Sequence, residues 1–296
     1  MKKMLVFFLL LAGAPAIGQE DSLPRDLELP PGFIKQADIV YTRGNGWEQK
    51  MDLYLPPKTT HPSAIIVNIH GGGWNHGTKE SQRGFGNFCK LGFAVANIEY
   101  RLVSAAPAPA AIEDARCALI FLITHAQELN IDVNRIVLMG SSSGGHLALM
   151  AGLMNDNHRF DGNCRPRTEI KVAAIVDKYG ITDVWDWAYG PNIRSQSALN
   201  WLGTRANDEQ FARSVSPINY VGRDNPPIFI VHGDADPTVP YQQSVLFNEM
   251  LVKAGVKTEF VTVPGGKHGG FEKKQNEMVN KKIISFLKEL HIADEK

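Results

Sequence analysis

The chain has few cysteines and no excess of either charge. Cys89, Cys117 and Cys164 are the three cysteines in 296 residues, and none lies in a Cys-x-x-Cys or Cys/His cluster, which disfavours a structural zinc or dithiol redox site. We expect all three to be mainly packing residues; because their number is odd, at most one pair can form a disulfide. Basic and acidic residues number 31 each, so charge does not favour nucleic acid or an anionic membrane as a partner.

Internal repeats and low-complexity tracts are also absent, and the first residues carry the pattern of an export signal. Lys2 and Lys3 precede a short apolar run, followed by small residues up to residue 18, and this order is typical of a secretory signal. We therefore expect residues 1–18 to be a signal peptide and the mature protein to be secreted or periplasmic, with no membrane attachment. Its removal takes the basic count to 29 against 31 acids, a net charge of −2.

The remaining chain has the pattern of one α/β domain. Residues 19–35 are expected to be an N-terminal linker, and residues 36–296 a single domain. The 44% hydrophobic content of the whole chain is enough for a substantial core. Apolar strand-like runs occupy residues 64–69, 93–98, 135–139, 171–177, 228–231 and 257–263, preceded by a predicted antiparallel pair at 39–42 and 51–55. Helical periodicity covers residues 111–129, 241–254 and 271–290. This alternation predicts a mostly parallel sheet with helices on both faces.

A serine-rich corner follows the strand at 135–139. The stretch GSSSGG, residues 140–145, lies between that strand and an apolar helical stretch. A nucleophile elbow needs small residues two positions before and two after the serine, because strand and helix cross there at short range. Ser142 alone has glycine at both places, Gly140 and Gly144. We therefore predict Ser142 as a nucleophile, rather than a glycine- and serine-rich helix entry without chemistry.

A serine nucleophile needs a histidine base and an acid to orient it. The strand at 228–231 is followed by HGDADPTVP, which offers Asp234 and Asp236, and the next strand is followed by PGGKHGG, which offers His268. This order of serine, acid and histidine is that of α/β-hydrolases, and His268 is a better candidate than His291 at the end of the last helix. The residues themselves do not decide between the two acids.

An oxyanion site is predicted at HGGGW, residues 70–74, directly after the strand at 64–69. Its glycines let backbone N–H groups approach a developing oxyanion, with one or two donors from Gly72 and Gly73 and another from Ser143. A phosphate-binding loop is the alternative, but the stretch lacks the lysine and hydroxyl residue of a P-loop.

At these motifs the chain resembles the α/β-hydrolase superfamily, and within it the HGGGW-type secreted carbohydrate esterases, which include acetyl xylan and feruloyl esterases. The likeness extends from about residue 36 to the C-terminus and includes EYRL at 99–102. It implies Ser142 as nucleophile, His268 as base and Asp236, rather than Asp234, as orienting acid. Family members usually have alanine where this chain has Ser143; since the donor there is backbone, catalysis is expected to survive. Arg101 is expected to be structural and His146 to be a core residue.

Specificity is expected to reside in a long insertion after the strand at 171–177. This segment, about residues 181–215, is rich in aromatic residues and too long for a simple turn, so we expect a lid. Trp185 and Trp187 in the lid, together with Trp74, are predicted to bind substrate by stacking; packing of the lid itself is the alternative.

The predicted function is therefore an exported serine carboxylesterase that needs no metal or organic cofactor. It is expected to hydrolyse short acyl or aromatic esters of small molecules or oligosaccharides, with acetyl or feruloyl groups on plant polysaccharide as the specific case. A peptidase-like serine hydrolase and a non-catalytic binding protein with this fold are the alternatives. The sequence does not indicate an oligomeric state.

Overall fold

The structure is a computed structural model that describes residues 27–293, apart from residues 45, 83, 156, 163, 165, 167, 192 and 193. The predicted signal peptide, residues 1–18, and the first part of the predicted linker lie outside the described residues.

The described strands form one sheet of eight in the order β1-β2-β4-β3-β5-β6-β7-β8. Their bounds are β1 Ile34–Gly44, β2 Trp47–Leu55, β3 Ser63–Ile69, β4 Ala94–Ile98, β5 Ile131–Ser141, β6 Ala174–Lys178, β7 Ile228–Gly233 and β8 Thr258–Val263. β2 is antiparallel to both of its neighbours, and every other neighbouring pair is parallel. The predicted architecture, a mostly parallel sheet that begins with an antiparallel pair, is confirmed.

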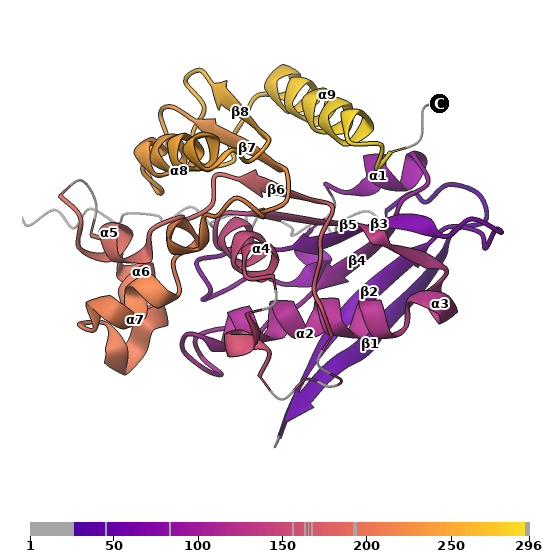
Figure 1. Cartoon of the computed structure of the whole chain (residues 1–296), viewed down its shortest axis with the longest axis horizontal. Helices are drawn as coiled ribbons and strands as arrows, with labels where there is room; N and C mark the ends of the chain where they lie inside the picture. The colour runs from indigo at the N-terminus through magenta and orange to yellow at the C-terminus, as the bar shows by residue number, and fades with distance from the viewer. Residues whose placement is uncertain are drawn as a thin grey trace, which may run out of the picture.

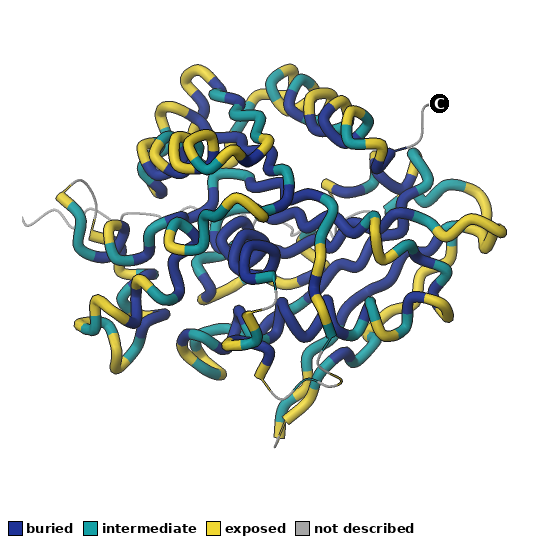
Figure 2. The backbone as a smooth tube through the Cα atoms, in the orientation of Figure 1, coloured by how far each residue is buried: buried dark blue, intermediate teal, exposed yellow. Residues whose placement is uncertain are grey.

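Helices cover both faces of this sheet (Figure 1). The α-helices of the described residues are α1 Gly86–Lys90, α2 Ala110–Thr124, α3 Ala126–Leu129, α4 Ser143–Leu153, α5 Val184–Tyr189, α6 Gln196–Leu202, α7 Glu209–Ser214, α8 Tyr241–Ala254 and α9 Lys273–Glu289. Residues of α2, α4 and α8 share one buried cluster with the sheet, and residues of α1 and α9 share a second cluster on the other face. The central strands and α4 are buried, whereas the outer sides of α8 and α9 are exposed (Figure 2).

The two clusters explain why the central strands are continuously apolar. Ile65 and Val67 of β3 belong to the cluster that contains α2 and α4, while Ile66 between them belongs to the cluster with α1 and α9. Successive side chains of a strand point to opposite faces, and here both faces are covered. Burial of both faces therefore requires apolar residues at every position.

Two predicted boundaries are wrong in detail. β1 begins at Ile34, inside the predicted linker, and Leu29 and Phe33 pack against the cluster with α1 and α9. The end of that segment is therefore part of the domain. The helix predicted for residues 111–129 is two helices, α2 and α3, which are separated at His125.

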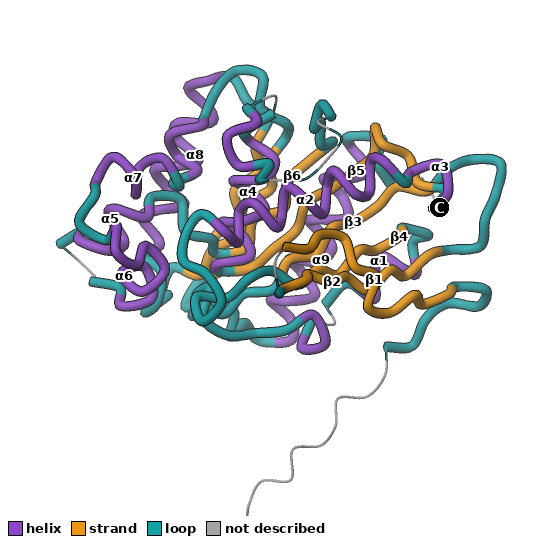
Figure 3. Tube along the Cα trace, turned by 90° about the horizontal axis from the view of Figure 1, so that it is seen from below, coloured by secondary structure: helices purple, strands orange, loops and turns teal. Residues whose placement is uncertain are grey.

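The carboxyl ends of the parallel strands meet at one edge of the sheet. Ile69 at the end of β3 pairs with Gly140 of β5, and Gly233 at the end of β7 pairs with Val263 at the end of β8. The HGGGW loop, the serine corner, the acid loop and the histidine loop leave the sheet from these ends. The insertion after β6 contributes α5, α6 and α7, which gather at one end of the molecule in both views (Figures 1 and 3).

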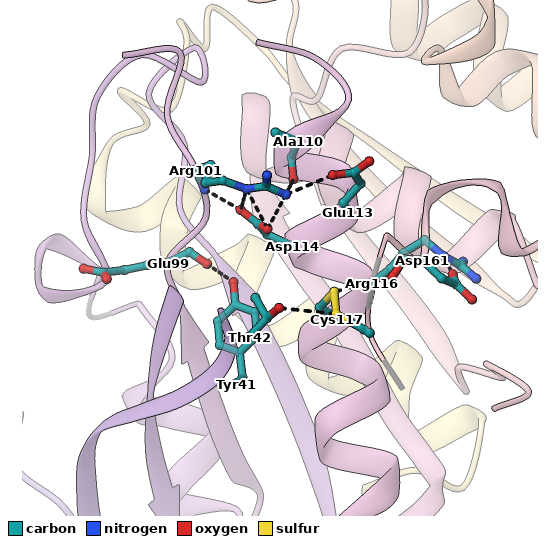
Figure 4. Close-up of a disulfide and its surroundings, with 11 residues drawn as sticks. Tyr41, Thr42, Glu99, Arg101, Ala110, Glu113, Asp114, Arg116, Cys117 and Asp161 are labelled. Atoms are coloured by element: carbon teal, nitrogen blue, oxygen red, sulfur yellow. Dashed lines mark hydrogen bonds and ion pairs between the residues drawn. A yellow bond between two sulfur atoms is a disulfide. The ribbon is translucent and has the colours of Figure 1, made fainter. Parts of the chain in front are cut away.

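The prediction that all three cysteines are packing residues is wrong for two of them. Cys117 of α2 and Cys164 form a disulfide across 47 positions of sequence, with Cα atoms 5.5 Å apart (Figure 4). The bond ties α2 to the segment between α4 and β6. Next to it the buried guanidinium of Arg116 pairs with Asp161 and donates to the carbonyl of Ala151 in α4, so this region anchors the helix that follows the serine corner.

Candidate active site

Ser142 lies at a strained corner between β5 and α4. Its backbone has φ of 56° and ψ of −125°, a region that residues with a side chain rarely adopt. A β-carbon built on Gly144 would lie 2.2 Å from the carbonyl oxygen of Ile69, so a larger residue does not fit beside β3. Ser143 is fully buried and Ser141 is still part of β5. Of the three serines, Ser142 alone occupies the corner.

The structure brings His268 and Asp236 to this serine. His268 Nε2 lies 2.8 Å from Ser142 Oγ, and His268 Nδ1 lies 2.7 Å from Asp236 Oδ2. The Asp236 side chain is fully buried, whereas that of His268 is one-fifth exposed. This is the geometry of a hydroxyl, a base within hydrogen-bond reach and an acid that orients the base.

The loop around Asp236 explains why this acid, and not Asp234, reaches the histidine. Asp236 Oδ1 accepts hydrogen bonds from the backbone N–H groups of Thr238 and Val239, at 2.7 and 3.0 Å, which leaves Oδ2 directed at His268. Asp234 is exposed and accepts from the N–H of Gly265 at 2.6 Å, so it holds the histidine loop in place.

The same contacts set the charge state of Asp236. Burial alone raises the pKa of its carboxyl, but hydrogen bonds from His232, His268 and the Thr238 backbone outweigh burial and hold that pKa well below 3.8. The carboxylate is therefore ionised at every pH at which an imidazole can act as a base.

The glycine loop presents unused donors to the same space. Gly72 and Gly73 have φ of +124° and +60°, and a β-carbon on Gly72 would lie 1.9 Å from the carbonyl oxygen of His76. Among the hydrogen bonds of the described residues, none is donated by the backbone N–H of Gly72, Gly73 or Ser143. These N–H groups are available to a ligand, as an oxyanion site requires.

The hydroxyl of Ser143 has a buried partner. Ser143 Oγ lies 3.3 Å from the hydroxyl of Tyr100, which donates to the carbonyl of His70 at 3.1 Å. Tyr100 belongs to the EYRL stretch and also stacks on the ring of His70. The serine at this position thus joins the start of α4 to the glycine loop, the two parts of the chain that carry the free N–H groups.

Ser142 and His268 open into a cavity of about 510 Å³. Most of its polar lining consists of small hydroxyl groups and amides. The lining residues are Gly71, Gly72, Gly73, His76, Gly77, Ser81, Gln82, Ser141, Ser142, Tyr179, Trp187, Ser197, Thr238, His268 and Gly269. Trp187 and Ser197 come from the lid helices α5 and α6, so the predicted insertion does form a wall of the cavity.

Only one of the three tryptophans predicted to bind substrate lines this cavity. Trp187 does so, and its indole N–H donates to the carbonyl of Thr238 at 2.9 Å. Trp74 is fully buried and stacks on Trp201 with ring centroids 4.2 Å apart. Trp185 packs on Tyr189 at 4.4 Å, away from the cavity. The prediction is therefore wrong for Trp74 and Trp185, which pack the lid and its base.

Arg101 and His146 occupy the structural positions expected of them. Arg101 binds the buried carboxylate of Asp114 through Nε and donates to the carbonyl of Ala110 (Figure 4). His146 is fully buried in α4 and contacts the carbonyl of Val215 at 2.8 Å.

Several site residues were missed from the sequence. His232, Tyr179, Thr238 and Ser197 contact the triad or line the cavity, but a lone histidine or hydroxyl in a strand, loop or helix carries no signal of its own. His232 had the strongest available signal, because it begins the HGDADPTVP stretch four residues before Asp236.

A second cavity among the described residues does not present an activated nucleophile. A cavity of about 690 Å³ lies at the opposite edge of the sheet, where β3 begins, and Cys89 lines it. Burial raises the pKa of the Cys89 thiol to about 11, so it is a poor nucleophile. The described part of the chain contains no group of three or more His, Cys, Asp or Glu side chains that could hold a metal ion. No described helix has the length and apolar character needed to cross a bilayer.

Comparison with known proteins places this arrangement among esterases. The BD-FAE family matches residues 51–251. Esterase LipC of Mycobacterium tuberculosis is 27% identical over 245 residues, which cover 80% of this chain and 60% of LipC. The chain spans 54% to 60% of the length of the first three curated relatives that it matches.

Two solved structures match this chain over nearly their whole length. A truncated carbohydrate esterase from gut microbiota has 30% identity and a TM-score of 0.76, with 87% of this chain and 96% of that chain covered. Esterase 2 of Thermogutta terrifontis, solved with propionate bound, has 26% identity and a TM-score of 0.74, with 90% and 97% covered.

Proposed function

The chain belongs to the BD-FAE family of α/β-hydrolase esterases, and on this basis we propose that it is a serine carboxylesterase with Ser142 as nucleophile. The observation that carries the proposal is the 2.8 Å contact between Ser142 Oγ and His268 Nε2 beside a cavity of about 510 Å³. A hydroxyl on a strained corner, with its base already in place, has no structural role that explains the strain.

In the proposed reaction His268 removes the Ser142 proton as the hydroxyl attacks an ester carbonyl. The bond to the alcohol then breaks, His268 returns the proton to the leaving alcohol, and an acyl-enzyme remains on Ser142. A water molecule, deprotonated by the same imidazole, then attacks the acyl carbon; the bond to Ser142 Oγ breaks, His268 returns the proton to that oxygen, and the acid is released. Asp236 holds the imidazole with Nδ1–H directed at Oδ2 and stabilises its cationic form.

The N–H groups of Gly72, Gly73 and Ser143 are the proposed oxyanion donors. Removal of one such donor in a serine hydrolase costs about 10² to 10³ in kcat. Because these donors are backbone groups, no single side-chain substitution removes them, and their position depends on the glycine loop and on the hydroxyl bridge between Tyr100 and Ser143.

We further propose short acyl or aromatic esters as substrates, with acetyl or feruloyl groups on plant polysaccharide as the specific case. Hydroxyl and amide groups of Ser81, Gln82, Ser197 and Thr238 line the cavity and suit a substrate rich in hydroxyl groups, while Trp187 offers an aromatic wall. The truncated gut carbohydrate esterase and the propionate-bound esterase are consistent with this class.

Export to an oxidising compartment is part of the proposal. Residues 1–18 carry the signal pattern described above, and the Cys117–Cys164 disulfide is of a kind that persists outside the reducing cytosol. Fractionation of cells that express the full chain tests this point. The proposal requires the protein in the periplasm or medium with residues 1–18 removed, and retention in the cytosol at full length contradicts it.

Hydrolysis of p-nitrophenyl acetate tests the esterase proposal. The wild-type protein is expected to turn over the ester, and Ser142→Ala is expected to reduce kcat by about 10⁴ or more. Ser104→Ala, which removes an exposed hydroxyl away from the cavity, is the matched control and is expected to keep full activity. Undiminished turnover by Ser142→Ala contradicts the assignment.

A substrate panel then separates the reaction classes. Acetylated xylan, methyl ferulate, p-nitrophenyl esters of increasing chain length and a dipeptide amide are compared by kcat/KM. We expect the short and aromatic esters to be hydrolysed faster than the amide. An acyl group on Ser142, detected by mass spectrometry of the quenched reaction, tests the covalent intermediate.

A further inference from the structure

Asp236 is shared by two imidazoles. Its Oδ2 lies 2.7 Å from Nδ1 of His268 and 3.1 Å from Nε2 of His232, four residues earlier at the end of β7. With the two backbone donors to Oδ1, the carboxylate accepts four hydrogen bonds and its side chain is fully buried. Both oxygens are therefore held, and the plane of the carboxylate does not rotate.

The contacts of His232 determine which of its nitrogens carries hydrogen. Nε2 faces two acceptors, Asp236 Oδ2 at 3.1 Å and the carbonyl of Val239 at 3.2 Å, so Nε2 is the donor. Nδ1 lies 2.7 Å from the hydroxyl of Ser244 in α8, which donates to it. Every polar atom of this fully buried ring is satisfied in the uncharged form.

We propose that His232 is a positioning residue that fixes the Asp236 carboxylate and sets how strongly that carboxylate acts on His268. The inference rests on the proposed function of Ser142, His268 and Asp236 and assigns to His232 a part in the same reaction. His232 does not line the cavity, so it acts through Asp236 and does not touch substrate.

The proposed effect has a definite electrostatic sign. Two N–H donors on one carboxylate oxygen share its negative charge, so each receives less of it than a single donor does. Loss of the His232 donor leaves the whole charge of Oδ2 to His268 and stabilises the protonated imidazole. The pH below which the enzyme loses activity then rises.

The other titratable groups around His232 do not supply this effect. They are the phenols of Tyr179 and Tyr241, whose rings lie 6.4 and 5.8 Å from the His232 ring, and Asp177, which acts on Tyr179. Burial raises the pKa of the Tyr179 phenol, so this group stays uncharged through the pH range of interest. The Tyr179 ring also contacts the ring of His268, with centroids 4.9 Å apart, but it is uncharged, so Asp236 is the charged group through which His232 acts on His268.

The test replaces His232 with a ring that has no donor and with a side chain that keeps one. His232→Phe is expected to lower kcat about tenfold with KM within about twofold. It is also expected to move the acid limb, the part of the pH profile in which kcat/KM falls at low pH, upward by about half a pH unit. His232→Gln, whose amide nitrogen takes the place of Nε2, is expected to return the limb to within about 0.2 pH units of wild type. The proposal is overturned if His232→Phe folds and the acid limb of its pH profile lies at the same pH as that of the wild type.

Ser244→Ala provides the second variant if His232→Phe does not fold. Without the hydroxyl, Nδ1 loses its partner and the ring is less firmly held, so the limb is expected to move in the same direction by a smaller amount. The proposal is overturned if the acid limb of kcat/KM lies at the wild-type pH in Ser244→Ala and also in any His232 variant that folds.

A measurement without catalysis separates this inference from the proposed function. The titration midpoint of the His268 imidazole, followed by NMR in the resting protein, is expected to rise in His232→Phe and to return in His232→Gln. If the wild-type protein hydrolyses no ester, the proposed function fails while the NMR titration still decides the role of His232. If the enzyme is active and the midpoint does not move, this inference alone fails.

Discussion

Gly140 and Gly144 are in backbone contact across the corner that carries Ser142: a β-carbon built on Gly140 would lie 2.1 Å from the carbonyl oxygen of Gly144. Gly140→Ala therefore forces β5 and α4 apart. We expect a loss of about 3 kcal/mol in the free energy of unfolding, or failure to fold, measured by urea denaturation.

Gly222→Ala is the matched control for this prediction. A β-carbon built on Gly222 would have no neighbouring atom within 4 Å, and the backbone there has no positive φ. Its replacement is therefore expected to change stability by less than about 0.5 kcal/mol. Equal stability of both variants contradicts the account of the corner.

Asp236→Asn and Asp234→Asn distinguish the two acids of the HGDAD stretch. An amide in place of the Asp236 carboxylate offers a donor to His268 and favours the wrong tautomer, so kcat is expected to fall by about 10³ to 10⁴. Asp234→Asn keeps a carbonyl oxygen for the N–H of Gly265 and is expected to remain within about threefold of wild type. Steady-state kinetics of both variants decide the assignment, and a larger loss at Asp234 reverses it.

Asp177 makes stability depend on pH. Burial raises the pKa of this fully buried carboxyl from 3.8 to about 7, so the native state binds the proton more tightly than the unfolded chain. Stability from this group is fully present below about pH 4 and is lost as the pH rises to about 7, by about 4 kcal/mol at most. The free energy of unfolding of Asp177→Asn, measured by urea denaturation, is expected to rise relative to that of the wild type between pH 5 and pH 8. Parallel pH profiles of the two proteins exclude a protonated Asp177.

The Cys117–Cys164 disulfide is expected to stabilise the fold by about 2 to 4 kcal/mol, because it closes a long loop in the unfolded chain. Reductant should therefore lower the Tm of the wild-type protein. The double variant Cys117→Ala and Cys164→Ala should unfold at that lower temperature with or without reductant. A wild-type Tm that is insensitive to reductant under conditions that reduce the bond contradicts this expectation.

Trp187 connects the lid to the acid loop. Trp187→Phe keeps an aromatic wall but loses the hydrogen bond to the carbonyl of Thr238, and Thr238 in turn donates to Asp236. We expect kcat/KM to fall about 3- to 10-fold. Trp185→Phe, which changes a ring outside the cavity, is expected to stay within about twofold. A larger effect at Trp185 than at Trp187 contradicts the placement of the substrate at this wall.

Much of the fold could be predicted because its signals are local. The continuous apolar runs predicted β3 to β8 within a few residues, and the periodic stretches predicted α2, α8 and α9. The break between α2 and α3 and the early start of β1 were not predicted. The first residues of β1 are exposed and are held by pairing with β2, so no local apolar pattern marks them.

Part of the candidate site could likewise be predicted from the sequence, and part could not. The corner of Ser142 could be predicted because the glycine spacing that its backbone requires occurs within six consecutive residues, 140–145. Trp74, Trp185 and Trp187 are chemically alike, and which of them meets the cavity depends on the direction in which the folded lid turns each ring.

The sequence by itself determined the class of fold, the order of nucleophile, acid and base, and the glycine loop, because these depend on periodicity and on neighbours along the chain. The resemblance already implied Asp236 as the orienting acid. Only the tertiary structure decided that Asp234 holds a loop, that Cys117 pairs with Cys164, and that a second histidine shares Asp236. These relationships join groups separated by loops and strands, and the physical reason is that distance and burial, unlike order, are properties of the folded chain.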